Sequence, residues 1–173
     1  MAGVLEVCDK VGEWLDSILP SIGECLEANN LEVSHAVREQ LYSGLDGEGR
    51  ELAPNYLSDP YFRARYKENA AYMARRYMEW KEDITPPEES EIGFSPRRPD
   101  TPNLFIDGTF HRSIKAGVSG DTLSIWTEGF KEGAAIEAKY GKQIFGLTEQ
   151  SRAWLLSRFI LPYLEKQKRF ILS

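Results

Sequence analysis

Two histidines and two cysteines are the residues of this 173-residue sequence that best suit metal binding. Neither His35 nor His111 belongs to an HExxH motif, and Cys8 and Cys25 do not form a CxxC pair. A structural zinc site would need further cysteine or histidine ligands. We therefore expect no metal site and interpret both cysteines as small buried residues, although a disulfide between them is compatible with the sequence.

Motifs for nucleophilic, calcium or phosphate chemistry are also incomplete. Residues 117–120 (GVSG) lack the G-x-S-x-G pattern of a nucleophile elbow, so we interpret Ser119 as a turn residue. A calcium loop that began at Asp46 would need Glu at its twelfth position, where Leu57 stands. The pair Gly141-Lys142 is not followed by the Ser or Thr of a phosphate loop. We expect no catalytic residue and no cofactor.

The charge balance bears on the class of partner. The sequence has 27 acidic and 21 basic residues, a net charge of −6, and only short basic runs. Specific nucleic-acid binding is not expected, because phosphate neutralisation supplies most of its affinity. The carboxylates show no spacing that pairs two of them for glycoside hydrolysis. No apolar run approaches the ~18 residues of a membrane span, and no basic leader precedes Glu6 and Asp9, so we expect a cytosolic protein without a signal peptide.

The elements that position these residues are helical in the first half. Helical spacing of apolar residues predicts an amphipathic helix over residues 3–19, which Pro20 bends or ends, and a short helix over 21–27. The buried stripe of the 3–19 helix is predicted to contain Val4, Cys8, Val11, Leu15 and Ile18, widened by Leu5 and Leu19. Asn30 is predicted to cap a helix that runs to about Ser43. That helix is expected to be buried through Val33, Val37 and Leu41.

A loop over residues 44–60 precedes a predicted long helix. Asp59 is a suitable cap with Pro60 in the first turn, and the helix is expected to run to about Lys81. Its apolar stripe is Phe62, Tyr66, Ala70, Met73, Tyr77 and Trp80. Residues 83–103 then contain five prolines and an acidic run. We predict that they form an extended arm or mobile loop, too polar to bury itself.

The second half is predicted to contain the β-structure. Residues 103–106 are expected to form a short strand, and alternation predicts another over residues 110–118. Gly120-Asp121 predicts a two-residue turn into a return strand over 123–126. A short helix is expected over 131–139, and Thr148 is predicted to cap a last helix over 149–169, kinked at Pro162. The predicted fold is α+β in one domain, 1–173: N-terminal and long central helices, a small antiparallel sheet with a long β-hairpin, and a C-terminal helix.

Five sequence blocks, in this order, resemble the virion morphogenesis proteins of tailed phages, a family also described as tail-completion or head–tail joining proteins. The blocks are residues 44–54 (GLDGEGRELAP), 103–114 (NLFIDGTFHRSI), 121–125 (DTLSI), 134–141 (AAIEAKYG) and 144–148 (IFGLT). The resemblance spans roughly residues 15–170, with an apparent insertion at 59–102. The sequence departs from the family where Lys139-Tyr140-Gly141 replaces a His-x-x-Gly motif and where a Pro-Ala-Arg before the last helix is missing. Residues 100–105 (DTPNLF) and the aromatic helix also resemble proteins of gut Bacteroidales phages.

The resemblance implies a non-enzymatic structural protein with an α+β fold. It implies a homo-oligomeric ring at the head–tail junction or tail end, with portal, neck or tail proteins as partners. It places the protein in the virion, and in the host cytoplasm during assembly, with no role for specific nucleic-acid recognition or a membrane.

The aromatic residues supply candidate contacts for such a ring. The sequence has eight Tyr, eight Phe and four Trp, more than one small core obviously needs, and interface cores are enriched in these residues. We expect Tyr66, Tyr77, Trp80 and Trp126 to contribute to a subunit interface. Two alternatives remain at this point: a small cytosolic binding or regulatory protein, and an enzyme with an unrecognised site.

Overall fold

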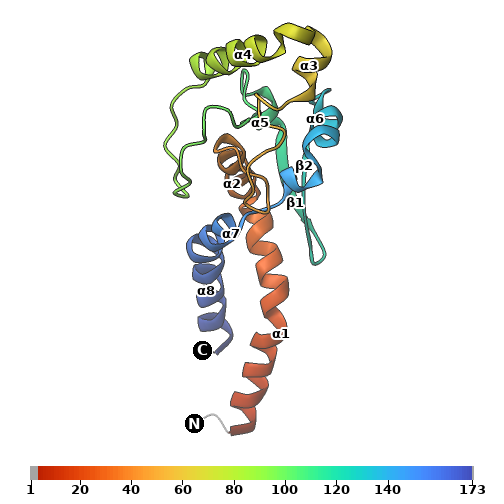
Figure 1. The fold of residues 1–173 in the computed structure, drawn as a ribbon. Coiled ribbons are helices and arrows are strands. Elements are labelled where there is room, and N and C mark those ends of the chain that lie inside the picture. Colours follow the sequence, from red (N-terminus) through yellow and green to blue (C-terminus); the bar gives the residue numbers. More distant parts are fainter. Residues whose placement is uncertain (1–3, 173) are drawn as a thin grey trace.

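The computed structural model describes residues 4–172 as an elongated, mostly helical α+β structure with one β-hairpin, in agreement with the predicted fold class. Helix α1 (Val4–Ala28) extends from the N-terminal end of the molecule toward its centre, and α8 (Leu161–Leu172) runs beside it (Figure 1). None of the helices within residues 4–172 is long and apolar enough to cross a membrane.

The N-terminal helices differ from the prediction at their ends. Pro20 lies inside α1 and does not end it. Helix α2 (Asn30–Tyr42) begins after Asn29, whose side-chain amide donates to the Cys25 carbonyl oxygen at 2.7 Å, so Asn30 is not the cap. The predicted burial of Val33, Val37 and Leu41 is confirmed, because all three are fully buried.

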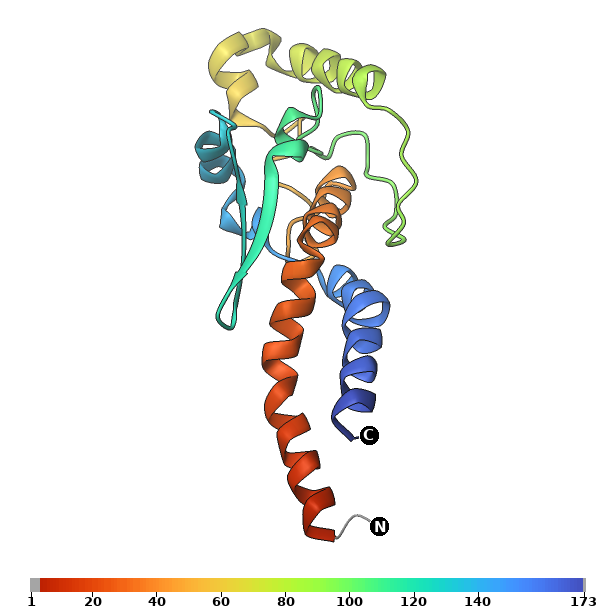
Figure 2. The same cartoon turned by 180° about the vertical axis from the view of Figure 1, so that it is seen from behind.

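The two cysteines have different surroundings. Cys25 is buried, as predicted, but Cys8 is exposed, and both thiols are free. Val11, Leu15 and Leu19 of the predicted buried stripe are exposed as well. The N-terminal half of α1 projects beyond the globular part of the molecule (Figure 2), and Cys8, Val11 and Leu15 stay exposed in this half. The side chains of Val4 and Leu5 lie outside the part of the chain whose burial the structure describes.

The predicted long helix is broken in two. Helix α3 (Pro60–Tyr66) is followed by a 3-10 turn, η1 (Lys67–Asn69), and by α4 (Ala70–Ile84). The Asp59 cap is confirmed, because its side chain accepts a hydrogen bond from the Tyr61 N–H. The chain turns back at Lys67, where φ is +48°. We call residues 60–84 the crown, since they lie at the end of the molecule opposite the N-terminus (Figure 1).

Aromatic packing explains the break. The rings of Phe62 and Tyr77 lie 5.5 Å apart between centroids. Fifteen residues separate them, which would place them about 22 Å apart along a straight helix at ~1.5 Å per residue. The turn at Lys67 therefore allows both rings to enter one cluster.

The predicted hairpin turn is confirmed, but the segment that leads into its first strand differs from the prediction. Strands β1 (Ile114–Ser119) and β2 (Thr122–Thr127) pair antiparallel, with Ser119 opposite Thr122 across the Gly120-Asp121 turn. Residues 103–106 form no strand, and residues 110–113 belong to the short helix α5 (Thr109–Ser113). Gly108, at φ +78°, turns the chain into α5, and the Asp107 carboxylate accepts the Thr109 N–H at 2.9 Å.

The C-terminal third follows the prediction closely. Helix α6 (Gly133–Tyr140) and the 3-10 turn η2 (Lys142–Phe145) lead to α7 (Glu149–Leu155), which Thr148 caps through the Ser151 N–H at 3.0 Å. A π-helical turn, η3 (Leu156–Ile160), joins α7 to α8. It lies just before Pro162, which lacks the N–H of a regular helix, so the predicted kink takes the form of a widened turn.

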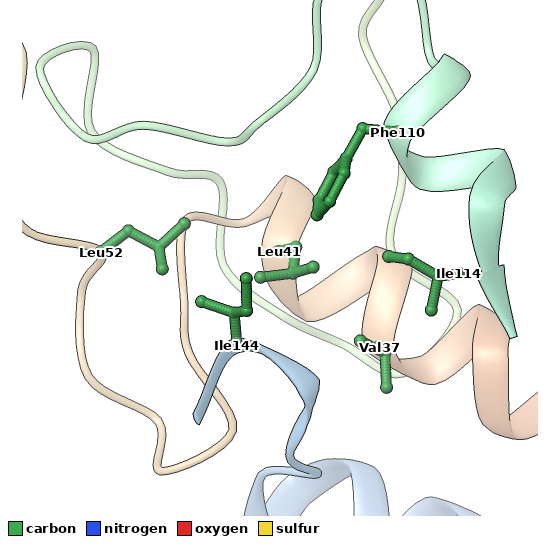
Figure 3. Packing of buried hydrophobic residues seen from close by; sticks show 6 residues of the cluster. All are labelled: Val37, Leu41, Leu52, Phe110, Ile114 and Ile144. Atoms are coloured by element: carbon green, nitrogen blue, oxygen red, sulfur yellow. The ribbon is translucent and has the colours of Figure 1, made fainter. Parts of the chain in front are cut away.

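The main core joins four elements and a loop. It consists of Val37, Leu41, Leu52, Phe110, Ile114 and Ile144, from α2, the 44–60 loop, α5, β1 and η2 (Figure 3). Gln40, also fully buried, donates to the Gly146 carbonyl oxygen at 2.6 Å and accepts from the Thr148 N–H at 3.1 Å. This one side chain therefore fixes α2 to the segment that leads into α7.

Residues 85–103 are extended, as predicted, whereas Asp83 and Ile84 still belong to α4. The prediction that the 83–103 segment is too polar to bury itself is wrong. Ile92 and Phe94 are buried and form a small core with Ala36 of α2. Thr101 and Asn103 are buried as well. Polar groups of this segment hydrogen-bond to partners far away in the sequence, among them Glu39 of α2.

Candidate functional site

Three of the four aromatic residues predicted for an interface lie together in the crown. The Tyr77 ring packs against Tyr56, Phe62 and Trp80, with centroid distances of 5.3 to 5.5 Å. Tyr66 stacks on Phe62 at 6.3 Å. Tyr66 and Tyr77 are half-buried, and burial raises the pKa of the Tyr77 hydroxyl. These two tyrosines therefore hold α3 against α4, whereas Trp80 remains 42% exposed.

Trp126 lies elsewhere, on the β-hairpin. It pairs with Lys115 across the strands and lies on the face opposite its half-buried neighbour Ile125. Its ring covers Gly117, where an added Cβ would lie 3.1 Å from the indole. Trp126 is 42% exposed and borders a surface hollow with Phe145 of η2. The interface role of all four residues stays a prediction.

The outer surface of the crown carries residues that the sequence analysis did not single out. Tyr61 and Tyr72 are exposed, as are the basic residues of the same stretch: Arg63, Arg65, Lys67, Arg75 and Arg76. A hollow of about 690 Å³ lies at the elbow between α3 and α4. The signal for these residues in the sequence is the presence of two arginines among three aromatic residues over 61–66 (YFRARY), whereas the apolar stripe alone predicts only a buried face.

Beneath the crown lies a layer of buried polar groups. His111 Nε2 is 2.8 Å from the Asn103 carbonyl oxygen, and only a protonated Nε2 can donate to that carbonyl. Burial, with the nearby positive charges of Lys81 and Arg38, lowers the pKa of His111 to about 4, and the hydrogen bond to Asn103 offsets part of this shift. Lys81 is itself only 2% exposed. Its burial, together with Arg97, lowers the pKa of the Lys81 amine to about 8.

A second polar cluster fastens the 83–103 segment to α2. Glu39, on the buried side of α2, accepts hydrogen bonds from the N–H groups of Glu91 at 3.1 Å and Ile92 at 3.2 Å, and from the Ser90 hydroxyl. His35, one turn earlier, lies 2.8 Å from the same carboxylate. The Ser90 oxygen in turn accepts two N–H groups, so its proton is directed to Glu39.

This second cluster is the nearest approach to a metal centre within residues 4–172. His35, Glu39 and Glu91 each offer one ligand atom, and these atoms lie within 4.8 Å of one another. Both oxygens of Glu39, however, already accept hydrogen bonds from the segment. The contacts of the cluster thus serve to hold the segment in place. The sequence analysis missed the cluster because Glu39 and Glu91 are 52 residues apart.

The remaining candidates for chemistry lie apart from one another. Ser119 is exposed at the end of β1, as expected of a turn residue. Asp46 binds its own loop, because its carboxylate accepts the N–H groups of Glu48 and Arg50 and pairs with the Arg50 guanidinium. Both groups therefore have structural roles.

No known protein family, curated protein or solved structure matches the chain.

Proposed function

We propose that this chain is a non-enzymatic structural protein of a tailed phage, part of a ring at the head–tail junction or tail end. It would meet further copies of itself and portal, neck or tail proteins there. It would act in the virion, after assembly in the host cytoplasm.

The observation that carries the proposal is the way in which the five family-like blocks come together. Each block supplies at least one side chain to the main core or its margin: Leu52, Phe110 with Ile114, Ile125, Ile136 with Tyr140, and Ile144 with Phe145. Blocks that lie up to 100 residues apart in the sequence therefore build one packed unit. A chance resemblance of short segments would not require them to share a core.

Two further features support an assembly role. The insertion at 59–102 supplies the crown and most of the 83–103 segment. These parts pack around the unit, and none of their residues belongs to the main core. The crown also presents exposed aromatic and basic residues, and aromatic residues and arginine are typical of protein interfaces.

The proposal is tested by following the protein through phage assembly. Mass spectrometry of purified particles is expected to find the chain at a fixed ratio to the portal protein. Deletion of its gene is expected to leave filled heads and tails that do not join, and expression of the chain from a plasmid should restore joining. Normal particles from the deletion strain would contradict the proposal.

A further inference from the structure

The N-terminal half of α1 presents an uncovered apolar stripe. Val11, Leu15 and Leu19 are 37%, 54% and 60% exposed, and Cys8 continues the same face toward the N-terminus. Residues at this three-to-four spacing lie on one side of a helix. We call these four residues the α1 stripe.

The rest of the molecule leaves this stripe free because its packing uses other parts of α1. Helix α8 lies against a different side, where Lys168 is placed 5.5 Å from the Trp14 ring and the Tyr163 hydroxyl donates to Glu24 at 3.1 Å. The hairpin reaches only the C-terminal half of α1, where a Cβ at Gly23 would lie 3.6 Å from Val118. The α1 stripe therefore lies along the part of α1 that the hairpin does not reach.

Acidic residues border one side of the stripe. Asp9 and Asp16 directly follow Cys8 and Leu15, and so lie on the adjoining side of the helix. Residues 8–28 contain five acidic side chains and one basic side chain. A partner for this surface should combine an apolar depression with positive charge.

The crown of the same chain has this combination. The hollow of about 690 Å³ between α3 and α4 is lined by apolar side chains that include Leu57, Phe62, Ala64 and Ala71. Four charged residues also line it: Arg63 and Lys67, the acidic Glu68, and Asp59, whose carboxylate is paired with Lys139. Residues 60–76 contain five basic side chains and one acidic side chain. We call this depression the crown hollow.

Helices α3 and α4, which line the crown hollow, lie at the end of the molecule opposite the N-terminal half of α1, which carries the α1 stripe (Figures 1 and 2). They therefore cannot meet within one chain. We propose that the α1 stripe of one subunit docks into the crown hollow of a second copy. This inference rests on the ring assembly of the proposed function and names the surfaces that would build it.

Charge favours this pairing over a symmetric contact between two identical surfaces. Two α1 stripes facing each other would bring acidic flanks together, and two crowns would bring basic flanks together. The stripe-to-hollow contact joins opposite charges and buries apolar surface on both sides. It is a head-to-tail contact, which repeats from subunit to subunit until a ring closes or a filament grows.

Disulfide trapping tests the contact with the natural thiol of Cys8. The variant Ala64→Cys places a second thiol in the crown hollow, and mild oxidation at high protein concentration is expected to give a ladder of disulfide-linked oligomers. Leu31→Cys, also at an exposed position but outside both surfaces, is the matched control and should give no comparable ladder. Adding Cys8→Ser or Leu15→Asp to Ala64→Cys should abolish the ladder.

A charge exchange, made in the Ala64→Cys background, provides the second readout. Asp16→Arg and Arg63→Asp should each slow cross-linking roughly fivefold, the effect of one exposed ion pair of about 1 kcal/mol. An equal mixture of the two variants should recover roughly 60% of the original rate, because half of the encounters then join surfaces of opposite charge and the other half stay slowed about fivefold.

Two results would overturn the inference: an Ala64→Cys ladder no stronger than that of Leu31→Cys, or a mixture no faster than either variant alone. A dominant Cys8–Cys8 dimer of the wild-type chain would also overturn it, in favour of symmetric pairing. These outcomes are separate from the proposed function, which fails if the chain is absent from virions whatever the cross-links show.

Discussion

Replacing Glu39 with Gln should release the 83–103 segment from α2. The Glu39 carboxylate is buried and accepts two backbone N–H groups and one hydroxyl from residues 90–92. Glutamine keeps one acceptor oxygen. Its NH₂ group would take the place of the other oxygen and would face a backbone N–H of the segment, which would then have no acceptor. Hydrogen bonds to a charged group contribute ~1.5–3 kcal/mol each, and an unsatisfied buried donor costs ~1–3 kcal/mol, so we expect a loss of about 2–4 kcal/mol.

The loss should appear first as local opening. A change of about 2–4 kcal/mol raises the open population roughly 30- to 700-fold. Limited proteolysis with a glutamate-specific protease reports this opening, because Glu88, Glu89 and Glu91 lie in the segment. In the wild-type chain we expect the first cuts between Asp83 and Thr101, at the exposed residues 86–89. In Glu39→Gln, cleavage should be faster and should extend through residue 91.

Glu89→Gln is the matched control for stability and hydrogen exchange, because Glu89 is an exposed glutamate of the same segment, although the change also removes one protease site. Its free energy of unfolding should match that of the wild type. If Glu39→Gln keeps the wild-type cleavage rate and hydrogen-exchange protection at residues 90–94, the account of how α2 holds this segment is wrong.

Three predictions concern stability measured by urea denaturation. Because burial lowers the pKa of His111 from 6.5 to about 4, the free energy of unfolding should fall by up to about 3 kcal/mol as the pH drops through this range, and His111→Gln should lose that part of the slope. Lys81→Met should stabilise the protein by about 1–3 kcal/mol at pH 7, and the gain should shrink above pH 8, where the folded amine is already neutral; an equal gain at all pH values would contradict this reasoning. Ile114→Ala, at a fully buried site, should cost ~2–5 kcal/mol, and Ile125→Ala, at a half-buried one, about 1–2 kcal/mol; the reverse order would mean that the hairpin packs differently.

Local signals were sufficient for several elements of the fold. The Gly120-Asp121 turn, the Asp59 and Thr148 caps and the buried positions of α2 depend on residues close together in the sequence, and all are confirmed. The break at Lys67 could not be predicted in this way, because its cause is the contact of Phe62 with Tyr77. The burial of residues 90–94 likewise depends on Glu39 and Ala36 of another helix.

In the candidate site, too, local sequence signals predict some features, and contacts between distant residues determine the others. Aromatic residues of the crown were recognised by type, but their grouping around Tyr77 follows from the broken helix. The exposed stripe of α1 was recognised as apolar and assigned to the core. Helical spacing shows that residues share a face, and only the packing of distant elements determines whether that face is covered.

The central claim, that this chain belongs to a ring at the junction of head and tail, is tested most directly by cryo-electron microscopy of the purified phage particle. We predict a ring of repeated density at the junction or tail end in which each unit accommodates the elongated fold, with α1 and the crown at opposite ends. A complete reconstruction of head, neck and tail with no density for this fold would contradict the account.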